Sequence, residues 1–163
     1  TMQPTIRLID PNDDPFLAAI IRQNLADHQL NLPGTAYFDP ELDHLSTFYA
    51  QPMANYFTIK DATLGVLGGG GYAPYDQTKK IAELQKFYLS PAAKGLRLSY
   101  SLLQTIEASA QELGYQQLYL ETHHLLSVAL HVYQKAGYLE IDGPLQHTQH
   151  TTMDRFFVKH LLN

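Results

Sequence analysis

The residues best suited to chemistry lie in one stretch, where a predicted strand ends in a short turn and the turn opens a long predicted helix. The stretch runs from Phe87 to Ser99, with Ser90-Pro91 ending the strand and Lys94 and Arg97 leading into the helix. The first turn of any helix has unpaired backbone N–H groups and the positive end of the dipole, so it suits a pyrophosphate. This order of elements indicates a site for a nucleotide-like cofactor, although an ordinary strand-to-helix connection shares it.

Other reactive residue types are absent or badly spaced for a metal or thiol site. The chain has no cysteine, which excludes a disulfide framework, a thiolate metal site and a cysteine nucleophile. Among the eight histidines, His123 and His124 are adjacent, and His147 and His150 are close in sequence. Neither pair has carboxylates at a convincing ligand spacing, so we expect no metal.

Composition limits the partners and the location. The chain has 163 residues, 45% of them hydrophobic and 17% charged, with a net charge of −5. These values are typical of one globular domain, expected from Met2 to Asn163, and the negative charge argues against general nucleic-acid binding. No run approaches the roughly 18–20 apolar residues of a membrane span, and the N-terminus lacks the layout of a secretory signal. We expect a cytoplasmic monomer or homodimer without a membrane or nucleic-acid partner.

Hydrophobic periodicity predicts the elements that must position the candidate site. Strands are predicted at 6–9, 56–60, 64–72, 81–89, 118–120, 138–141 and 155–161, and helices at 14–25, 39–48, 91–113 and 126–136. Asp14-Pro15 and Asp39-Pro40 each pair a capping residue with a proline suited to the first helical position. Hairpins followed by strand–helix–strand units predict an α/β fold, with a mixed, mostly antiparallel twisted sheet of about seven strands flanked by about four helices.

Four consecutive glycines, Gly68 to Gly71, fall inside the predicted strand at 64–72. Glycine weakens a strand, so the run predicts a bulge or a close approach of two backbones. A flexible linker is the alternative, and the apolar flanks disfavour it.

Several segments together resemble the acyl-CoA N-acyltransferase (GNAT) superfamily. Pro91 followed by Lys94 resembles the family's acetyl-CoA loop, in which a proline precedes a basic or amide residue by three positions. The segment 64–71 is similar to the family's glycine-rich third strand, and 118–123 to its fifth strand. The segment 129–138 is similar to the family's helix that ends in tyrosine, a short spacer, glycine and an aromatic residue. The resemblance covers nearly the whole chain, with 6–48 matching in layout only.

This resemblance implies a single GNAT domain and an N-acetyltransferase. Its co-substrate would be acetyl-CoA, and a primary amine of a small molecule or peptide would attack the thioester directly. The cofactor-binding residues implied by position are Phe87, Tyr88, Leu89, Lys94, Gly95, Leu96, Arg97, Leu98, Ser99 and His123. In this family the fourth strand splays from the fifth, so the backbone of 87–89 would hold the pantetheine arm, and the Leu89 amide would polarise the thioester carbonyl.

The resemblance also implies catalytic roles for Tyr133 and Glu83. Tyr133 matches the general acid that protonates the departing sulfur, and a phenol of normal pKa stays protonated near pH 7. A core aromatic is the alternative interpretation. Glu83 lies where some members place a base that acts directly or through water, and a solvated strand-end carboxylate is the alternative. His123 falls on the family's frequent asparagine position beside the pantetheine.

The loop departs from the family pattern at three positions. The two loop glycines fall on Arg97 and Ser99, and Lys94 replaces the usual Arg or Gln. Arg97 could obstruct the pyrophosphate, or it could swing outward and form a charge-assisted contact, which is the outcome we expect. If Arg97 is part of the first helical turn, a glycine there would cost the helix about 1 kcal/mol.

A function of another class stays open. A GNAT-like domain could bind acyl-CoA or another ligand without catalysis, as a regulatory module, and Arg97 and Ser99 favour this alternative. The length of the acyl group and the identity of the acceptor are not set by the sequence. Tyr37, Phe38 and Tyr72 could line the acceptor pocket, although packing roles are the stronger interpretation.

Overall fold

The computed structural model describes residues 3–93 and 97–162, and these form one sheet with helices on both faces. The sheet order is β1-β2-β3-β4-β5-β7-β6. Its strands are β1 (Pro4–Leu8), β2 (Asn55–Asp61), β3 (Gly65–Asp76), β4 (Ile81–Leu89), β5 (Gln117–Thr122), β6 (Leu139–Ile141) and β7 (Arg155–His160). Neighbouring strands are antiparallel except for the parallel pair β4–β5.

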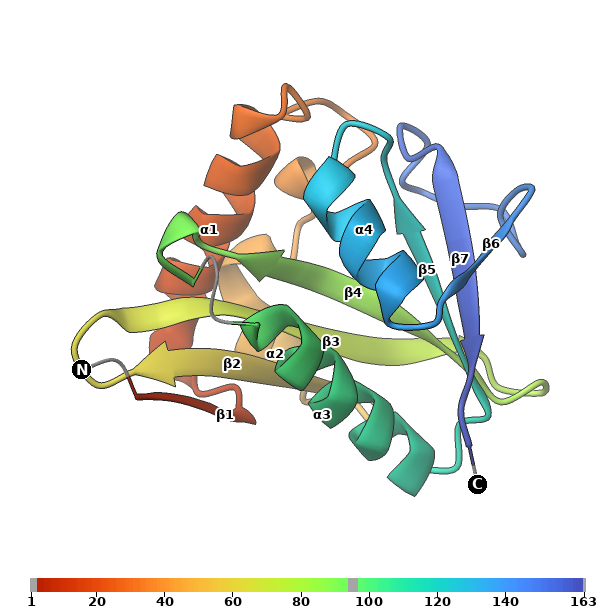
Figure 1. The fold of residues 1–163 in the computed structure, drawn as a ribbon, viewed down its shortest axis with the longest axis horizontal. Helices are drawn as coiled ribbons and strands as arrows, with labels where there is room; N and C mark the ends of the chain where they lie inside the picture. The colour runs from red at the N-terminus through yellow and green to blue at the C-terminus, as the bar shows by residue number, and fades with distance from the viewer. Residues whose placement is uncertain (1–2, 94–96, 163) are drawn as a thin grey trace.

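The α-helices of the described residues are α1 (Asp14–Asp27), α2 (Leu45–Phe48), α3 (Leu98–Glu112) and α4 (Ser127–Lys135). Helices α3 and α4 pack on one face of the sheet, and α1 packs on the other (Figure 1). The predicted fold class is therefore confirmed. None of the helices within the described residues is long and apolar enough to cross a membrane.

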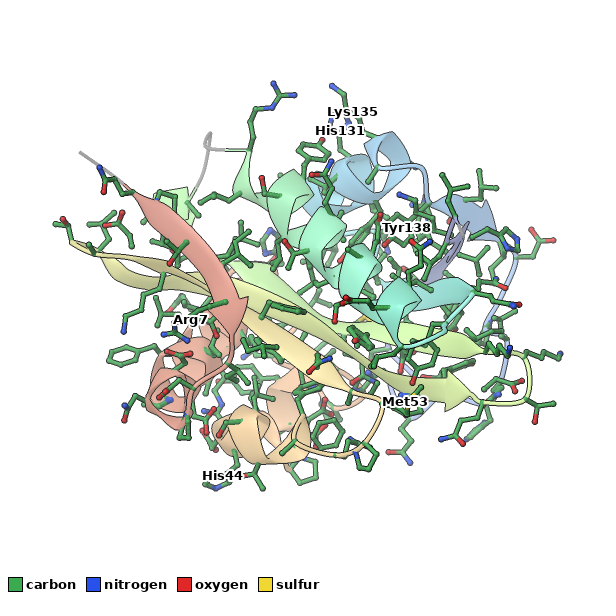
Figure 2. All side chains as sticks on the ribbon, turned by 90° about the horizontal axis from the view of Figure 1, so that it is seen from below. Arg7, His44, Met53, His131, Lys135 and Tyr138 are labelled. Atoms are coloured by element: carbon green, nitrogen blue, oxygen red, sulfur yellow. The ribbon has the colours of Figure 1, made fainter. Side chains whose placement is uncertain are left out.

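The two larger hydrophobic clusters lie on opposite faces of the sheet. The apolar stripe of α3, with Leu102 and Ile106, is fully buried against the sheet, and Leu17 and Ile21 of α1 are buried on the opposite face. Tyr138 (labelled in Figure 2) follows α4. Its hydroxyl donates a hydrogen bond to Glu107 of α3 over 2.8 Å and so links the two helices. Packing in the first cluster and this hydrogen bond hold α3 and α4 in place on the sheet.

The glycine run lies where β3 passes close to its neighbours. A Cβ on Gly70 would lie 2.7 Å from the ring of Phe87, and one on Gly71 would lie 2.4 Å from the carbonyl oxygen of Asn55. Both distances are too short for a real side chain. The predicted close approach of two backbones is therefore confirmed, and the alternative of a flexible linker is wrong.

The predicted helix at 39–48 is wrong over most of its length. Its only α-helical part is α2, preceded by 3₁₀ turns at Ala36–Phe38 and Leu42–His44. Asp39 does not cap a helix, because its carboxylate binds Lys86 and His150 instead. Long-range ionic contacts thus replaced the local capping role that the Asp-Pro pair suggested.

The beginnings of two other helices also differ from the prediction. Asp10, and not Asp14, makes the capping box at the first turn, while the Asp14 carboxylate accepts hydrogen bonds from Ser46. Residues Pro91–Ala93 form a 3₁₀ turn, and α3 begins at Leu98. The long helix therefore starts later than the proline at 91 indicated.

Candidate active site

The parallel strands β4 and β5 separate partway along their length. Their pairing runs from Ile81–Gln117 to Glu83–Tyr119, and the described residues show no paired rung beyond it, although β4 continues to Leu89. A cavity of about 540 Å³ fills the opening, lined by Phe87, Tyr88 and Leu89 of β4, by residues of β5 and by α4. Among the described residues, the β4 backbone after Glu83 therefore has no strand partner on the β5 side, as the resemblance implied.

A bulge in β4 lies next to this opening. Gly71 pairs with Gln85 and Gly69 pairs with Tyr88, so β4 has one residue more than β3 between these two pairs. Lys86 lies in this bulged stretch of β4 and has a φ of +53°, in the left-handed region. Lys86 is among the residues that line the cavity, and its side chain is buried.

The N-terminus of α3 forms one end of the cavity. Arg97, Leu98 and Ser99 line it, together with Ser90 and Pro91. The predicted loop residues Lys94, Gly95 and Leu96 lie outside the described residues. On the other side of the strand end, Asn24 of α1 donates a hydrogen bond to the Leu89 carbonyl over 3.2 Å.

Arg97 is not a residue of the first helical turn, which corrects the sequence-based expectation. It precedes α3 as the N-cap and has a φ of +57°, a conformation that favours glycine. The backbone therefore follows a left-handed path at the position where the family has its first loop glycine. A glycine at this position would not cost the helix the ~1 kcal/mol expected for a helical residue.

Tyr133 of α4 lines the cavity at its apolar wall. Its side chain is almost fully buried, and its ring lies 5.8 Å from the ring of Phe87 between centroids. Burial raises the pKa of the Tyr133 hydroxyl, with the neighbouring Tyr88 adding to the effect. Among the described residues we find no hydrogen bond to this hydroxyl, so it is available as a proton donor to a group in the cavity.

Glu83 lies at the last paired rung of β4 and β5. Its carboxylate accepts a hydrogen bond from the Gln85 side chain over 2.8 Å. Burial raises the pKa of Glu83 to about 7, and the charge of Glu121 adds to the rise while the hydrogen bond from Gln85 opposes it. Such a carboxylate can accept a proton near neutral pH. Glu83 is not one of the residues lining the cavity, but its neighbour Glu121 is.

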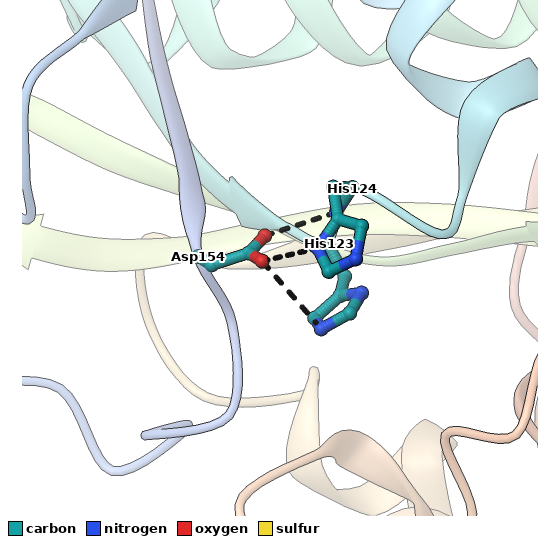
Figure 3. A group of neighbouring side chains, drawn as sticks. All are labelled: His123, His124 and Asp154. Carbon is teal, nitrogen blue, oxygen red and sulfur yellow. Dashed lines mark hydrogen bonds and ion pairs between the residues drawn. The ribbon is translucent and has the colours of Figure 1, made fainter.

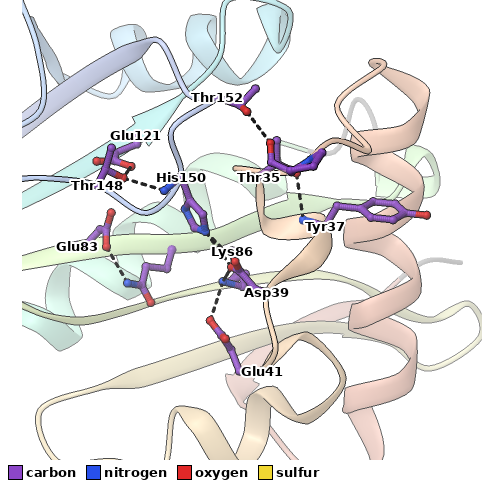
Figure 4. A network of polar contacts seen from close by, with 12 residues as sticks. Thr35, Tyr37, Asp39, Glu41, Glu83, Lys86, Glu121, Thr148, His150 and Thr152 are labelled. Carbon is purple, nitrogen blue, oxygen red and sulfur yellow. Dashed lines mark hydrogen bonds and ion pairs between the residues drawn. The ribbon is translucent and has the colours of Figure 1, made fainter.

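A polar network covers the sheet face on which Glu83 lies (Figure 4). Lys86 Nζ contacts Asp39 at 2.5 Å and Glu41 at 3.3 Å, and His150 Nε2 approaches the Asp39 carboxylate at 2.9 Å. The hydrogen bond to Asp39 raises the pKa of His150. Burial would raise the pKa of Asp39, but His150 and Lys86 outweigh it and the pKa is lowered.

The segment between β6 and β7 completes this network. Thr148 donates to one oxygen of Glu121 over 2.5 Å, and the Tyr119 hydroxyl donates to the other over 2.7 Å. The sequence motifs predict no role for Glu121 or Lys86, and His150 stands out only as one of two closely spaced histidines. The sequence did contain one signal that could have pointed to Lys86. Glu83 and Lys86 are charged residues inside an otherwise mostly apolar central strand.

His123 is not placed as predicted. It follows Thr122, which lines the cavity, but is not itself a lining residue. Its Nδ1 accepts a hydrogen bond from the Leu125 amide, and its Nε2 lies 3.7 Å from Asp154, which also binds His124 (Figure 3). The turn after β5 thus directs the ring toward Asp154, so a direct contact with the pantetheine has no support from this geometry.

The group of His123, His124 and Asp154 also has the residue types of a metal site. Burial lowers the pKa of His123, which favours its neutral form. Because Nδ1 is the acceptor for the Leu125 amide, the proton of the neutral ring is on Nε2, the nitrogen that faces Asp154. While the hydrogen bond from Leu125 is made, that nitrogen is a donor toward Asp154, and metal binding there would require the loss of this hydrogen bond or of the proton. We therefore interpret the group as a hydrogen-bonded cluster linking the end of β5 to β7.

The aromatic residues Tyr37, Phe38 and Tyr72 are not among the residues that line the cavity. Tyr72 is fully buried, and its hydroxyl lies 2.7 Å from the Ser109 hydroxyl. It packs edge-on to Tyr115. Tyr72 is thus a packing residue.

Comparisons with known proteins agree with this geometry. Residues 22–138 match the family model described as "Acetyltransferase (GNAT) family". The chain is 36% identical over 149 residues to the uncharacterized N-acetyltransferase YjgM of Escherichia coli (strain K12), covering 90% of this chain and 89% of that protein.

Solved structures show the same fold. A GNAT-family acetyltransferase from Staphylococcus aureus Mu50 superposes with a TM-score of 0.85 at 17% identity, covering 98% of this chain and all of the other. A phosphinothricin acetyltransferase from Sinorhizobium meliloti, solved with acetyl-CoA, has a TM-score of 0.75 at 18% identity, covering 98% of this chain and 89% of the other. At these identities the likeness concerns the fold alone.

Proposed function

The chain belongs to the acetyltransferase (GNAT) family and is an acyltransferase, and we propose that it moves an acetyl group from acetyl-CoA to a primary amine. One observation carries this proposal. The pairing of β4 and β5 ends at Glu83 and Tyr119, and the cavity beyond contains both the β4 backbone and Tyr133. A thioester in this cavity would lie between backbone N–H groups and a buried phenol.

On the cofactor side, each contact comes from residues that line the cavity. The N-terminus of α3 and the Arg97 guanidinium would bind the pyrophosphate, because free N–H groups and a guanidinium both suit phosphate oxygens. The backbone of Phe87 to Leu89 would hold the pantetheine arm. The Leu89 amide would donate to the thioester carbonyl oxygen, where negative charge develops in the transition state.

The chemical step requires one base and one acid. The nitrogen of the neutral amine attacks the thioester carbon, and the C–S bond breaks as the amide forms. Glu83, with its pKa of about 7, would take the amine proton directly or through water. Tyr133 would donate its hydroxyl proton to the thiolate that leaves, since its raised pKa keeps it protonated.

The acceptor would enter on the side of the polar network. Glu83 and Glu121 are adjacent there, and the described residues provide no ion pair to either carboxylate. Partly buried carboxylates of this kind favour an amine over an anionic acceptor. We propose a primary amine of a small molecule or peptide as the acceptor class.

The alternative of a non-catalytic module is weakened by the conformation of Arg97. Its backbone already follows the left-handed path that glycine favours, so the loop does not depend on a glycine at this position. At this position the direction of the Arg97 side chain then decides whether acetyl-CoA binding is helped or hindered. The position no longer argues for a degenerate loop.

Two measurements test the proposal. Calorimetric titration and thermal unfolding should show that acetyl-CoA binds and raises the melting temperature, because a ligand that binds only the folded state stabilises it. A panel of amines, with detection of free CoA, should then give turnover with at least one acceptor. Binding without turnover on any amine would support the non-catalytic module, and no binding at millimolar acetyl-CoA would contradict the proposed acetyl transfer.

A further inference from the structure

Lys86 combines two unfavourable features inside a central strand. Its backbone is left-handed, with a φ of +53°, and its side chain is only 4% exposed. A non-glycine residue in this conformation is strained, and a buried ammonium group must be compensated by partners. A residue keeps a strained backbone and a buried charge only where contacts with its surroundings stabilise both.

The bulge at Lys86 decides which face of β4 each later residue occupies. Ala82 and Leu84 pack in the cluster of α3 and α4, and Phe87 packs against the same cluster. Tyr88 packs against the cluster of α1. Side chains of a regular strand alternate, so without the extra residue Phe87 would face α1. The bulge therefore sets the orientation of the whole segment from Phe87 to Leu89.

Contacts from two other segments hold Lys86 in place. The Tyr56 hydroxyl of β2 donates to the Lys86 carbonyl over 2.8 Å. The Lys86 ammonium donates to Asp39 at 2.5 Å and to Glu41 at 3.3 Å, both from the connection between α1 and α2. We name Lys86, Asp39 and Glu41 the bulge clamp (Figure 4).

The two carboxylates of the clamp are themselves fixed to different degrees. Asp39 has a second partner, His150 Nε2 at 2.9 Å, and its side chain is 15% exposed. Glu41 is 23% exposed, and its contact with Lys86 is the longer one. Asp39 is therefore the stronger anchor of the Lys86 side chain.

We propose that Asp39 and Glu41, acting through Lys86, are positioning residues for acyl transfer. They fix the bulge, and the bulge places the backbone of Phe87 to Leu89 against the thioester. The inference rests on the proposed function, because it assumes that acetyl-CoA lies along β4. It adds that residues of the polar network around Lys86 and Asp39, which we name the acceptor side, control the geometry of the cavity at Phe87 to Leu89, which we name the donor side.

The test compares Lys86→Met with Lys79→Met, a matched change in the exposed turn between β3 and β4. Acetyl-CoA labelled with carbon-13 at the thioester carbonyl reports polarisation by infrared spectroscopy. In the wild type and in Lys79→Met we expect a shift to lower frequency on binding. In Lys86→Met we expect this shift to shrink and kcat to fall by roughly ten- to a hundred-fold, the cost of a misplaced reacting group. Acetyl-CoA affinity should change by less than about threefold, because the pyrophosphate contacts remain.

Milder variants keep the test valid if Lys86→Met does not fold. Asp39→Asn and Glu41→Gln should reproduce the reduced carbonyl shift, with the larger effect in Asp39→Asn. Combining Asp39→Asn with Lys86→Met should add little to the larger single loss, because the residues act as one unit. Lys86→Arg should restore most of the carbonyl shift, since it keeps the charge.

The outcomes separate this inference from the proposed function. If folded clamp variants match the wild type in kcat and carbonyl shift, the clamp is only structural and the inference is wrong. If the wild type itself shows no carbonyl shift and no turnover, the proposed function fails, whatever the clamp variants do.

Discussion

The two sides of strand β4 are built in different ways. At the end of β4 lies the cavity, whose lining is mostly apolar, and its shape follows from strand pairing that stops at Glu83. On the side of α1, charged side chains from three separate segments meet around Lys86 and Asp39. The donor side thus depends on backbone geometry and the acceptor side on side-chain identity. Substitutions at the cavity should therefore act on acetyl-CoA binding or on the transfer step directly, and substitutions in the network through the pH profile, the stability or the β4 backbone.

The largest effect is expected from Tyr133→Phe on the donor side. Turnover should fall by roughly ten- to a thousand-fold with little change in acetyl-CoA affinity, the pattern of a proton donor that acts in the transition state. Steady-state kinetics with calorimetric titration of acetyl-CoA measures both quantities. Normal turnover in a folded Tyr133→Phe protein would show that Tyr133 is a core aromatic.

On the acceptor side, Glu83→Gln should change the pH profile as well as the rate. With a pKa of about 7, Glu83 becomes an effective base only as the pH rises through that value. We expect kcat/KM for the amine to rise through about pH 7 in the wild type. In Glu83→Gln it should be about a hundred-fold lower at pH 8 and lack that ascending limb.

The stability of the same variant provides an independent control. Because the folded pKa of Glu83 is raised from 4.5 to about 7, its contribution to wild-type stability falls as the pH rises between these values. Denaturant unfolding of Glu83→Gln should lack this fall. A pH profile of kcat/KM that keeps its ascending limb in Glu83→Gln would assign the base to another group.

Arg97→Gly tests the donor side at the mouth of the cavity. Loss of a charge-assisted contact should weaken acetyl-CoA binding by about 1–3 kcal/mol. The folding free energy should change by less than ~1 kcal/mol, because relief of the left-handed strain offsets the flexibility of an unfolded glycine chain. Calorimetry and urea unfolding check the two values. Tighter binding in the folded variant would mean that the Arg97 side chain obstructs the pyrophosphate.

The smallest effect is expected from His150→Asn on the acceptor side. The pKa of His150 is raised by its hydrogen bond to Asp39, so its contribution to stability is complete below the unfolded pKa and is lost as the pH rises through the folded value. The variant should be destabilised by about 1 kcal/mol at pH 6 and by less at pH 9. Equal destabilisation at both pH values would show that His150 acts without its charge.

Sequence reasoning succeeded where local patterns determine the structure. The glycine run predicted the close approach of β3 to its neighbours. That Phe87 and Tyr133 meet at one cavity was implied by the resemblance and not by hydrophobic periodicity. The strand pairing that opens the cavity entered only through the resemblance. The positive φ of Arg97 was not predictable, because no residue type there signals a left-handed conformation.

The acceptor side could not be predicted for a physical reason. Asp39 and His150 are 111 positions apart in the chain, and hydrophobic periodicity carries no information about which loop ends meet over a sheet. The capping signal at Asp39 was outweighed by ionic contacts with Lys86 and His150. His123 was misplaced because the direction of a side chain after a strand depends on the following turn.

Hydrogen exchange with and without acetyl-CoA tests the division of β4 into a donor and an acceptor side most directly. We expect that saturating acetyl-CoA slows exchange in peptides spanning the end of β4, the beginning of α3 and the facing part of α4. Peptides around Asp39 and His150 should be protected only when an amine acceptor is added. Protection by acetyl-CoA confined to the segments of Asp39 and His150, with none at Phe87 to Leu89, would contradict the account.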